Sequence, residues 1–253
     1  MENQMIRKSN YLIEASYKLS TVEQKIILFL ATTIKSDDED FKSYPIRLKN
    51  FQNFIGNSSV QYDRVENMIL SLKEKNLKIV YPNEEGKKVT LNVSWLSSSE
   101  YVEGSGIVSL CFDPKLKLFL LQLKSRFTNY RIKNIVQLKS QFSIRIYELL
   151  KQYEKIGQRV FTISDLRSTL GVEDCQYKLY ADFKRKVILV AQRELAEKTD
   201  ISFKFEEIKM GHGVGQIRFF IKSKIQEKTQ PAEAETIQIV TPSLAIEPPK
   251  DEN

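Results

Sequence analysis

The sequence predicts an α+β protein made of two winged-helix domains in tandem, followed by a disordered, acidic, proline-containing tail. Two observations lead to this prediction: one segment of the chain is repeated, and the same order of helices and strands surrounds both copies. Apolar residues at helical and strand spacing define those elements. We expect an N-terminal domain at 1–133, a C-terminal domain at 134–224 and a tail at 225–253.

The repeat aligns Ile46–Gly56 with Phe161–Gly171 without a gap, and it extends to a tyrosine that follows each copy, Tyr62 and Tyr177. Each copy indicates a short strand, a short helix and a turn that opens a longer helix. In the second copy Thr162 or Ser164 can cap the helix, and Gly171 can end it in a left-handed conformation. A chance coincidence in a generic α+β protein is the alternative, but the shared glycine and tyrosine favour a true repeat.

An amphipathic helix is predicted before each copy. The first has the capping-box pair Ser20 and Glu23, followed by the apolar residues Ile26, Ile27, Leu30 and Ile34. The second has apolar residues at helical spacing from Ile135 through Leu138, Phe142, Ile146 and Leu149 to Leu150. A longer helix and two alternating strands follow each copy, and these strands are 89–95, 107–112, 201–205 and 216–221. This is the element order of a winged helix-turn-helix, present twice.

Charge is distributed unevenly along the 253 residues. The formal net charge is +7, but residues 225–253 carry −4 and residues 1–224 therefore +11. The tail also holds four of the seven prolines and no aromatic residue, so it cannot bury enough apolar area to offset its ordering entropy. We expect it to be disordered, as an inert terminus or as a partner-binding arm.

The two cysteines, Cys111 and Cys175, lack the spacing of a disulfide framework or a metal site. They indicate reduced thiols in a cytoplasmic protein. We expect no membrane partner, since no apolar run approaches the roughly 20 residues of a membrane span and the N-terminus does not have the pattern of a signal peptide.

The second helix of a helix-turn-helix enters the major groove of DNA, with its N-terminal residues at the base edges. The corresponding segment here is 177–187, which starts with Tyr177. At about 100° per residue, Leu179 lies on the buried side, while Lys178 and Arg185 point away from it. Arg185 is the leading candidate for base readout because its guanidinium can donate two hydrogen bonds to guanine, and Lys178 is the second.

Other basic residues are better placed for the phosphate backbone of double-stranded DNA. Lys184 and Lys186 flank the outer face of the same helix, although a short basic run can also be an ordinary solvated face. The glycine-rich segment 209–215 is suited to the tip of a wing, where Lys209 and the nearby Arg218 could follow the backbone; an ordinary loop is the alternative. In the first domain 58–64 opens the equivalent helix, with Arg64 as its cation.

Several of these segments together resemble the Rep initiator family of iteron-containing, theta-replicating plasmids. The resemblance covers about 10–222 and is carried by 10–24, 130–132, 143–151, 182–187 and the glycine-rich hairpin with the strand 216–221. It implies that Lys178 and Arg185 reach bases. The family's wing commonly has Gly-Arg where this chain has Gly211-His212.

The resemblance also implies a function in plasmid replication. Monomers of such proteins bind repeated iterons at the origin, help to open it, and recruit the host initiator and the replicative helicase. Dimers, formed mainly through the N-terminal domain, bind an operator and repress the gene. A winged-helix transcription regulator without a replication role fits the same fold, and the residues themselves do not separate the two.

The sequence does not indicate an enzyme, a cofactor or a metal. A nickase of the rolling-circle type needs paired histidines, and His212 is the one histidine of the chain. Gly86-Lys87-Lys88 lacks the earlier glycine and the hydroxyl of a phosphate-binding loop. Carboxylate pairs such as Glu84-Glu85 are typical of solvated loops, so we expect no catalytic residue.

Overall fold

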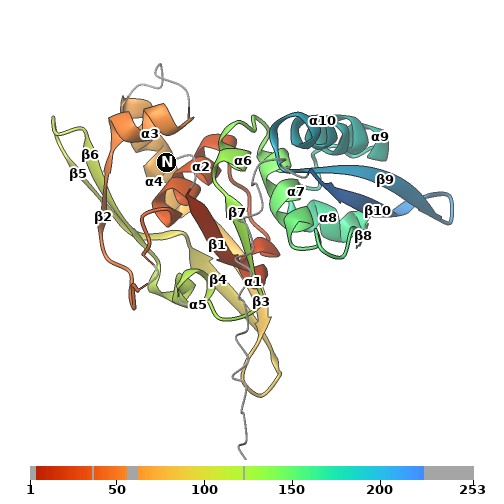
Figure 1. Cartoon of the computed structure of the whole chain (residues 1–253), viewed down its shortest axis with the longest axis horizontal. Helices are drawn as coiled ribbons and strands as arrows, with labels where there is room; N and C mark the ends of the chain where they lie inside the picture. Colours follow the sequence, from red (N-terminus) through yellow and green to blue (C-terminus); the bar gives the residue numbers. More distant parts are fainter. Residues whose placement is uncertain (1–3, 36, 56–61, 122, 225–253) are drawn as a thin grey trace, which may run out of the picture.

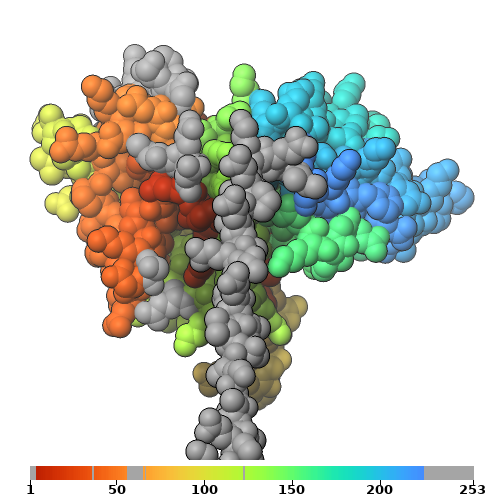
Figure 2. Space-filling view, viewed as in Figure 1, coloured from red at the N-terminus to blue at the C-terminus, as the bar shows by residue number. Residues whose placement is uncertain are grey.

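The computed structural model describes residues 4–35, 37–55, 62–121 and 123–224. The disordered tail predicted at 225–253 and the turn predicted after the first copy of the repeat, at Gly56, fall outside this part of the chain. The described helices and strands gather into two adjacent lobes, one for each half of the sequence (Figures 1 and 2).

The first half contains a helix-turn-helix surrounded by short sheets (Figure 1). Its elements are β1 (Met5–Ser9), α1 (Asn10–Ile13), α2 (Thr21–Ala31), β2 (Tyr44–Arg47), α3 (Leu48–Ile55), α4 (Tyr62–Glu74), β3 (Asn76–Pro82), β4 (Lys88–Ser94), β5 (Leu96–Val102), β6 (Ile107–Phe112), η1 (Pro114–Leu116), α5 (Lys117–Leu120), β7 (Phe127–Arg131) and α6 (Lys133–Val136). The predicted capping box is confirmed: Ser20 Oγ accepts from Glu23 N, and Glu23 Oε2 accepts from Ser20 N. Helix α2 ends at Ala31, so Ile34 lies beyond it and is half-buried.

The second half repeats the order of helix, strand, two helices and hairpin. Its elements are α7 (Gln141–Lys151), β8 (Gln158–Thr162), α8 (Ile163–Thr169), α9 (Tyr180–Phe183), the π-helical turn η2 (Lys184–Ile188), α10 (Leu189–Lys198), β9 (Ile201–Met210) and β10 (Gly213–Ser223). In both halves the strand before the helix-turn-helix pairs with the last strand of the hairpin, giving the sheets β2-β6-β5 and β8-β10-β9. The prediction of two winged-helix domains is confirmed.

Two predictions about the elements around the repeats are wrong. The strands at 89–95 and 107–112 belong to different hairpins, because β4 pairs with β3 and β6 pairs with β5. The helix expected from Ile135 to Leu150 is two helices, α6 and α7. It is interrupted because Ser140 Oγ accepts from the backbone N–H groups of Phe142 and Ser143 and so starts a new helix.

A buried polar cluster joins α7 to β1 and β7. Glu148 accepts hydrogen bonds from Lys8 Nζ at 2.7 Å, from Arg145 Nη1 at 3.2 Å and from the hydroxyl of Tyr130. The side chains of Lys8, Arg145 and Glu148 are each at most 3% exposed. Burial opposes the charge on Glu148, but attraction to Lys8 and Arg145 outweighs it and holds the pKa of this carboxyl below its ordinary value.

The guanidinium of Arg145 also binds the chain segment between α1 and α2. It donates to the carbonyl oxygens of Ile13 and Ala15, both at 2.8 Å, and to the hydroxyl of Tyr17 at 2.6 Å. These bonds join α7 to the segment between α1 and α2, and all of their donors and acceptors are buried.

Candidate nucleic-acid interface

The helix-turn-helix of the second half begins as the sequence predicts. Thr162 is the N-cap of α8, and its Oγ1 accepts from Asp165 N at 3.0 Å. Gly171 follows the helix with φ +66°, the left-handed value that glycine adopts without strain. A Cβ at Gly171 would lie 2.2 Å from the carbonyl oxygen of Tyr17. The start of the turn therefore packs directly against the backbone of the first half.

Arg167 holds the turn between the two helices. Its guanidinium donates to three backbone carbonyls, those of Gln176 at 2.7 Å, Tyr177 at 3.0 Å and Glu173 at 3.3 Å. The same group lies 5.3 Å from the ring centroid of Phe183. Sequence reasoning did not identify Arg167, because an arginine in a short helix usually indicates a solvated surface and nothing local shows which carbonyls will come near.

The second helix begins later than predicted. The helical segment runs without interruption through α9, η2 and α10, and it starts at Tyr180 rather than at Tyr177. Tyr177 has φ +49° and belongs to the turn, together with Lys178 and Leu179. Tyr62 is the first residue of α4, so the repeat register that matches it to Tyr177 holds through the strand and the first helix and is lost in the turn.

The prediction that Leu179 is buried is wrong, since this side chain is 68% exposed. A periodicity of 100° per residue does not apply before the helix starts. Within the helix the π-helical turn η2 also shifts the phase, because it adds a residue to one turn. The side chains buried there are Phe183, Val187, Ile188 and Ala191.

Arg185 and Lys186 are exposed on the outer face of this helix, as the sequence predicts. Arg185 Nη2 lies 2.7 Å from Asp182 Oδ1, one turn earlier, and the arginine side chain remains 70% exposed. Lys186 Nζ lies 5.6 Å from the ring centroid of Tyr177. Lys178 is exposed just before the helix. The structure thus leaves three cations exposed near the start of one helix in the sequence: Lys178, Arg185 and Lys186.

Lys184 differs from its neighbours because it is directed toward the wing. Its Nζ lies 2.7 Å from Glu207 Oε1 on β9, and the hydroxyl of Tyr180 donates to the same oxygen at 2.9 Å. The hydrogen bond from Lys184 holds the pKa of the Glu207 carboxyl below its ordinary value. Lys184 therefore ties the helix that begins at Tyr180 to the sheet, and its ammonium group is less free to bind a ligand than that of Lys186.

The wing is the hairpin of β9 and β10, with a tight turn at Gly211 and His212. Gly211 has φ +64°, as such a turn requires. Lys209 is exposed near this tip. Arg218 lies opposite Glu206 on the neighbouring strand, and their side chains form an ion pair at 3.3 Å. Lys209 is therefore the freer of the two predicted wing cations.

The equivalent region of the first half is only partly described. Helices α3 and α4 correspond to α8 and to the helix that begins at Tyr180, but residues 56–61 between α3 and α4 lie outside the described residues, as does the side chain of Arg64. In the part of the chain that the structure describes, no group of three histidine, cysteine, aspartate or glutamate side chains could hold a metal ion. None of the helices placed by the structure is both long and apolar enough to cross a membrane.

Family models match both halves of the chain. Residues 5–151 match "Initiator Replication protein, WH1", and residues 162–221 match "Initiator Rep protein, WH2". The chain belongs to this family. Both matches agree with the two winged-helix domains seen in the structure, and they confirm the resemblance to plasmid replication initiators.

Two proteins of Escherichia coli are similar to this Rep initiator in sequence. An uncharacterised 27.6 kDa protein is 24% identical over 212 residues, which cover 79% of this chain and 88% of that protein. The PI protein is 26% identical over 173 residues, which cover 62% of this chain and 55% of that protein.

A solved structure extends the likeness to the whole fold. The crystal structure of the Pi initiator protein in complex with iteron DNA superposes with a TM-score of 0.70 and covers 89% of this chain and 100% of that chain. Because the sequence identity is only 18%, this likeness shows the fold alone, that is, the two winged helices.

Proposed function

We propose that this Rep initiator binds the iterons of a plasmid origin as double-stranded DNA and reads them mainly with the C-terminal domain, 134–224. The observation that carries the proposal is the set of exposed cations, Lys178, Arg185 and Lys186, around the start of the second helix of a helix-turn-helix. The Pi initiator, which has the same fold, was crystallised with iteron DNA. The N-terminal domain, 1–133, supplies auxiliary DNA contacts through α4 and Arg64.

We assign the rest of the initiator's role from the family resemblance. The bound protein helps to open the origin and recruits the host initiator and the replicative helicase, and it acts by binding and not by catalysis. It works in the cytoplasm, without a cofactor or metal. A dimer in equilibrium with the monomer represses the initiator's own gene.

A plasmid-maintenance assay tests this function. A minimal origin with the repeated sites from the DNA flanking the gene is introduced into host cells with and without the gene. We expect the plasmid to persist only with the gene. Persistence in its absence would contradict the initiator role and favour the alternative, a transcription regulator without a replication role.

Arg185 and Lys186 should differ in how they contribute to DNA binding. Arg185→Ala is expected to reduce the binding free energy for iteron DNA by about 1 to 3 kcal/mol and to relax specificity at one base pair. The reason is that the arginine guanidinium can donate two hydrogen bonds to one guanine. Lys186→Ala should weaken binding to all DNA sequences alike. It should also lower the slope of log affinity against log salt concentration by about one, as expected for the loss of a phosphate contact. Fluorescence anisotropy with iteron and random duplexes over a salt series measures both. Equal losses on the two duplexes for Arg185→Ala would contradict its role.

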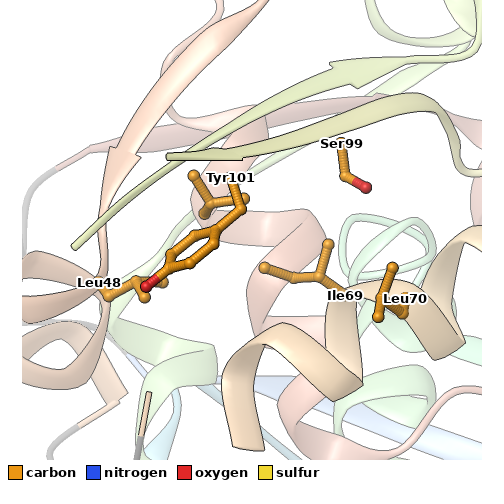
Figure 3. A pocket seen from close by; sticks show the side chains of 6 residues that line it. Leu48, Ile69, Leu70, Ser99 and Tyr101 are labelled. Atoms are coloured by element: carbon orange, nitrogen blue, oxygen red, sulfur yellow. The ribbon is translucent and has the colours of Figure 1, made fainter. Parts of the chain in front are cut away.

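An apolar surface of the first domain supports the proposed dimer. Strand β5 is at the edge of its sheet, and a pocket of about 150 Å³ lies between it and α4 (Figure 3). Its lining is mostly apolar and comprises Leu48, Ile69, Leu70, Ser99, Tyr101 and Val108. Leu70 is 51% exposed and Tyr101 37% exposed. An edge strand beside exposed apolar side chains is a surface on which a second copy can pair.

Leu70→Glu should weaken this dimer. A carboxylate in an apolar interface loses its hydration without a partner, so we expect the dissociation constant of the dimer to rise about tenfold or more. Analytical ultracentrifugation measures it, and Leu118→Glu on α5 is the control because Leu118 is 69% exposed and does not line the pocket. An unchanged dimer fraction for Leu70→Glu would contradict this interface.

A further inference from the structure

Leu179 is an exposed apolar side chain at the start of the reading helix. It occupies the N-cap position of α9, with extended backbone (φ −83°, ψ 135°), and its side chain makes no capping hydrogen bond. It is 68% exposed. An exposed leucine keeps its apolar surface in water in the free protein, and this one lies directly before the helix that the proposed function places in the major groove.

The turn holds Leu179 in this outward position. Arg167 fixes the carbonyls of Gln176 and Tyr177, the residues just before Lys178 and Leu179. The ring of Tyr177 packs on Phe142, with centroids 6.1 Å apart. With the backbone of Tyr177 in the left-handed region and its ring directed inward, the chain turns the next two side chains toward solvent. The outward direction of Leu179 is therefore set by the contacts of its neighbours.

The surroundings of Leu179 identify the kind of surface it meets. Lys178 precedes it, and Arg185 and Lys186 are exposed on the helix that it opens. One apolar side chain therefore accompanies three cations in this segment. A binding partner that matches this combination is a polyanion that also carries an apolar group. In the major groove the apolar feature on a base edge is the 5-methyl group of thymine.

We propose that Leu179 contacts a thymine methyl group in the iteron and so contributes to sequence readout. This inference rests on the proposed function, in which the helix that begins at Tyr180 enters the major groove. Arg167 acts as a positioning residue through the turn and does not itself touch the DNA.

Replacement of single thymines by deoxyuridine tests the contact, because uracil lacks only the methyl group. The probe is an iteron duplex in which each thymine of the footprint is replaced in turn. Burial of one methyl group is worth about fourfold in affinity. We expect the wild type to bind about fourfold more weakly when one particular thymine is replaced. Leu179→Ala should bind the unmodified duplex at least that much more weakly and should no longer respond to that replacement.

Two further variants make the test specific. Leu179→Met keeps an apolar side chain of similar volume and should retain the response to deoxyuridine. Leu118→Ala removes an equally exposed leucine from α5, far from α9 (Figure 1), and should leave both affinity and response unchanged. Thermal unfolding of Leu179→Ala should match the wild type, since the side chain is mostly exposed.

The outcomes separate this inference from the proposed function. If the wild type binds iteron and shuffled duplexes equally, the proposed function fails and the inference fails with it. If the wild type prefers the iteron but no deoxyuridine replacement weakens it, or if Leu179→Ala responds as strongly as the wild type, the thymine contact alone is overturned.

Discussion

Replacement of Glu148 by alanine should lower the free energy of unfolding by about 3–5 kcal/mol, because it leaves two buried cations without their anion. Lys8 and Arg145 are both nearly inaccessible and both bind this carboxylate. Urea unfolding followed by circular dichroism measures the loss.

A matched surface pair is the control for Glu148. Glu85 Oε2 lies 2.7 Å from Lys87 Nζ, but the Glu85 side chain is 66% exposed. Glu85→Ala should therefore leave the unfolding midpoint close to that of the wild type. A small change for Glu148→Ala, similar to that of Glu85→Ala, would contradict a stabilising role for the buried cluster.

The contribution of Glu148 should also depend on pH. The folded protein holds the pKa of this carboxyl below its ordinary value, so its stabilisation is fully present above the unfolded pKa of about 4.3 and is lost as the pH falls through the lower folded pKa. The difference in unfolding free energy between wild type and Glu148→Ala should therefore shrink in acid. A difference that stays constant down to pH 2 would contradict an ionised Glu148.

Replacement of Gly171 by alanine should have the second largest effect, about 3 kcal/mol or more. The left-handed backbone costs a residue with a Cβ about 1–2 kcal/mol, and the new atom would lie 2.2 Å from the carbonyl oxygen of Tyr17 and 2.8 Å from its carbonyl carbon. Because both neighbours are backbone atoms, the turn has to move away from the first half. We expect iteron binding to weaken together with stability.

Gly157→Ala separates backbone strain from the clash. Gly157 has φ +80°, but a Cβ there would have nothing within 4 Å. This variant should lose only the unfolding free energy that the left-handed backbone costs, and it should bind iteron DNA as the wild type does. Urea unfolding measures the loss of stability in both variants. Equal losses would show that the close approach of Gly171 to Tyr17 adds nothing to the cost of Gly171→Ala.

Much of the fold could be predicted from sequence because local rules decide it. The capping box at Ser20 and the left-handed turn at Gly171 depend on residues within a few positions of each other. The repeat register holds for the strand and the first helix for the same reason. The pairing of β3 with β4 could not be predicted, because alternation of apolar residues identifies a strand but not its partner.

The candidate interface was predicted less completely than the fold. The exposure of Arg185 on the outer face followed from helical spacing. The exposure of Leu179 did not, since it depends on where the helix starts, and that start is set by Arg167, which contacts a turn six to ten residues away. The pairing of Lys184 with Glu207 likewise requires the sheet of the wing to be in place.

The affinity of the full chain for one iteron duplex, compared with a shuffled duplex of the same composition at physiological salt, tests the central claim most directly. Sequence-specific readout by the second helix-turn-helix predicts that the iteron binds at least about 10³ times more tightly, the lower range for specific DNA-binding proteins. Affinities for the two duplexes within about tenfold of each other would contradict it, because phosphate contacts alone give that result.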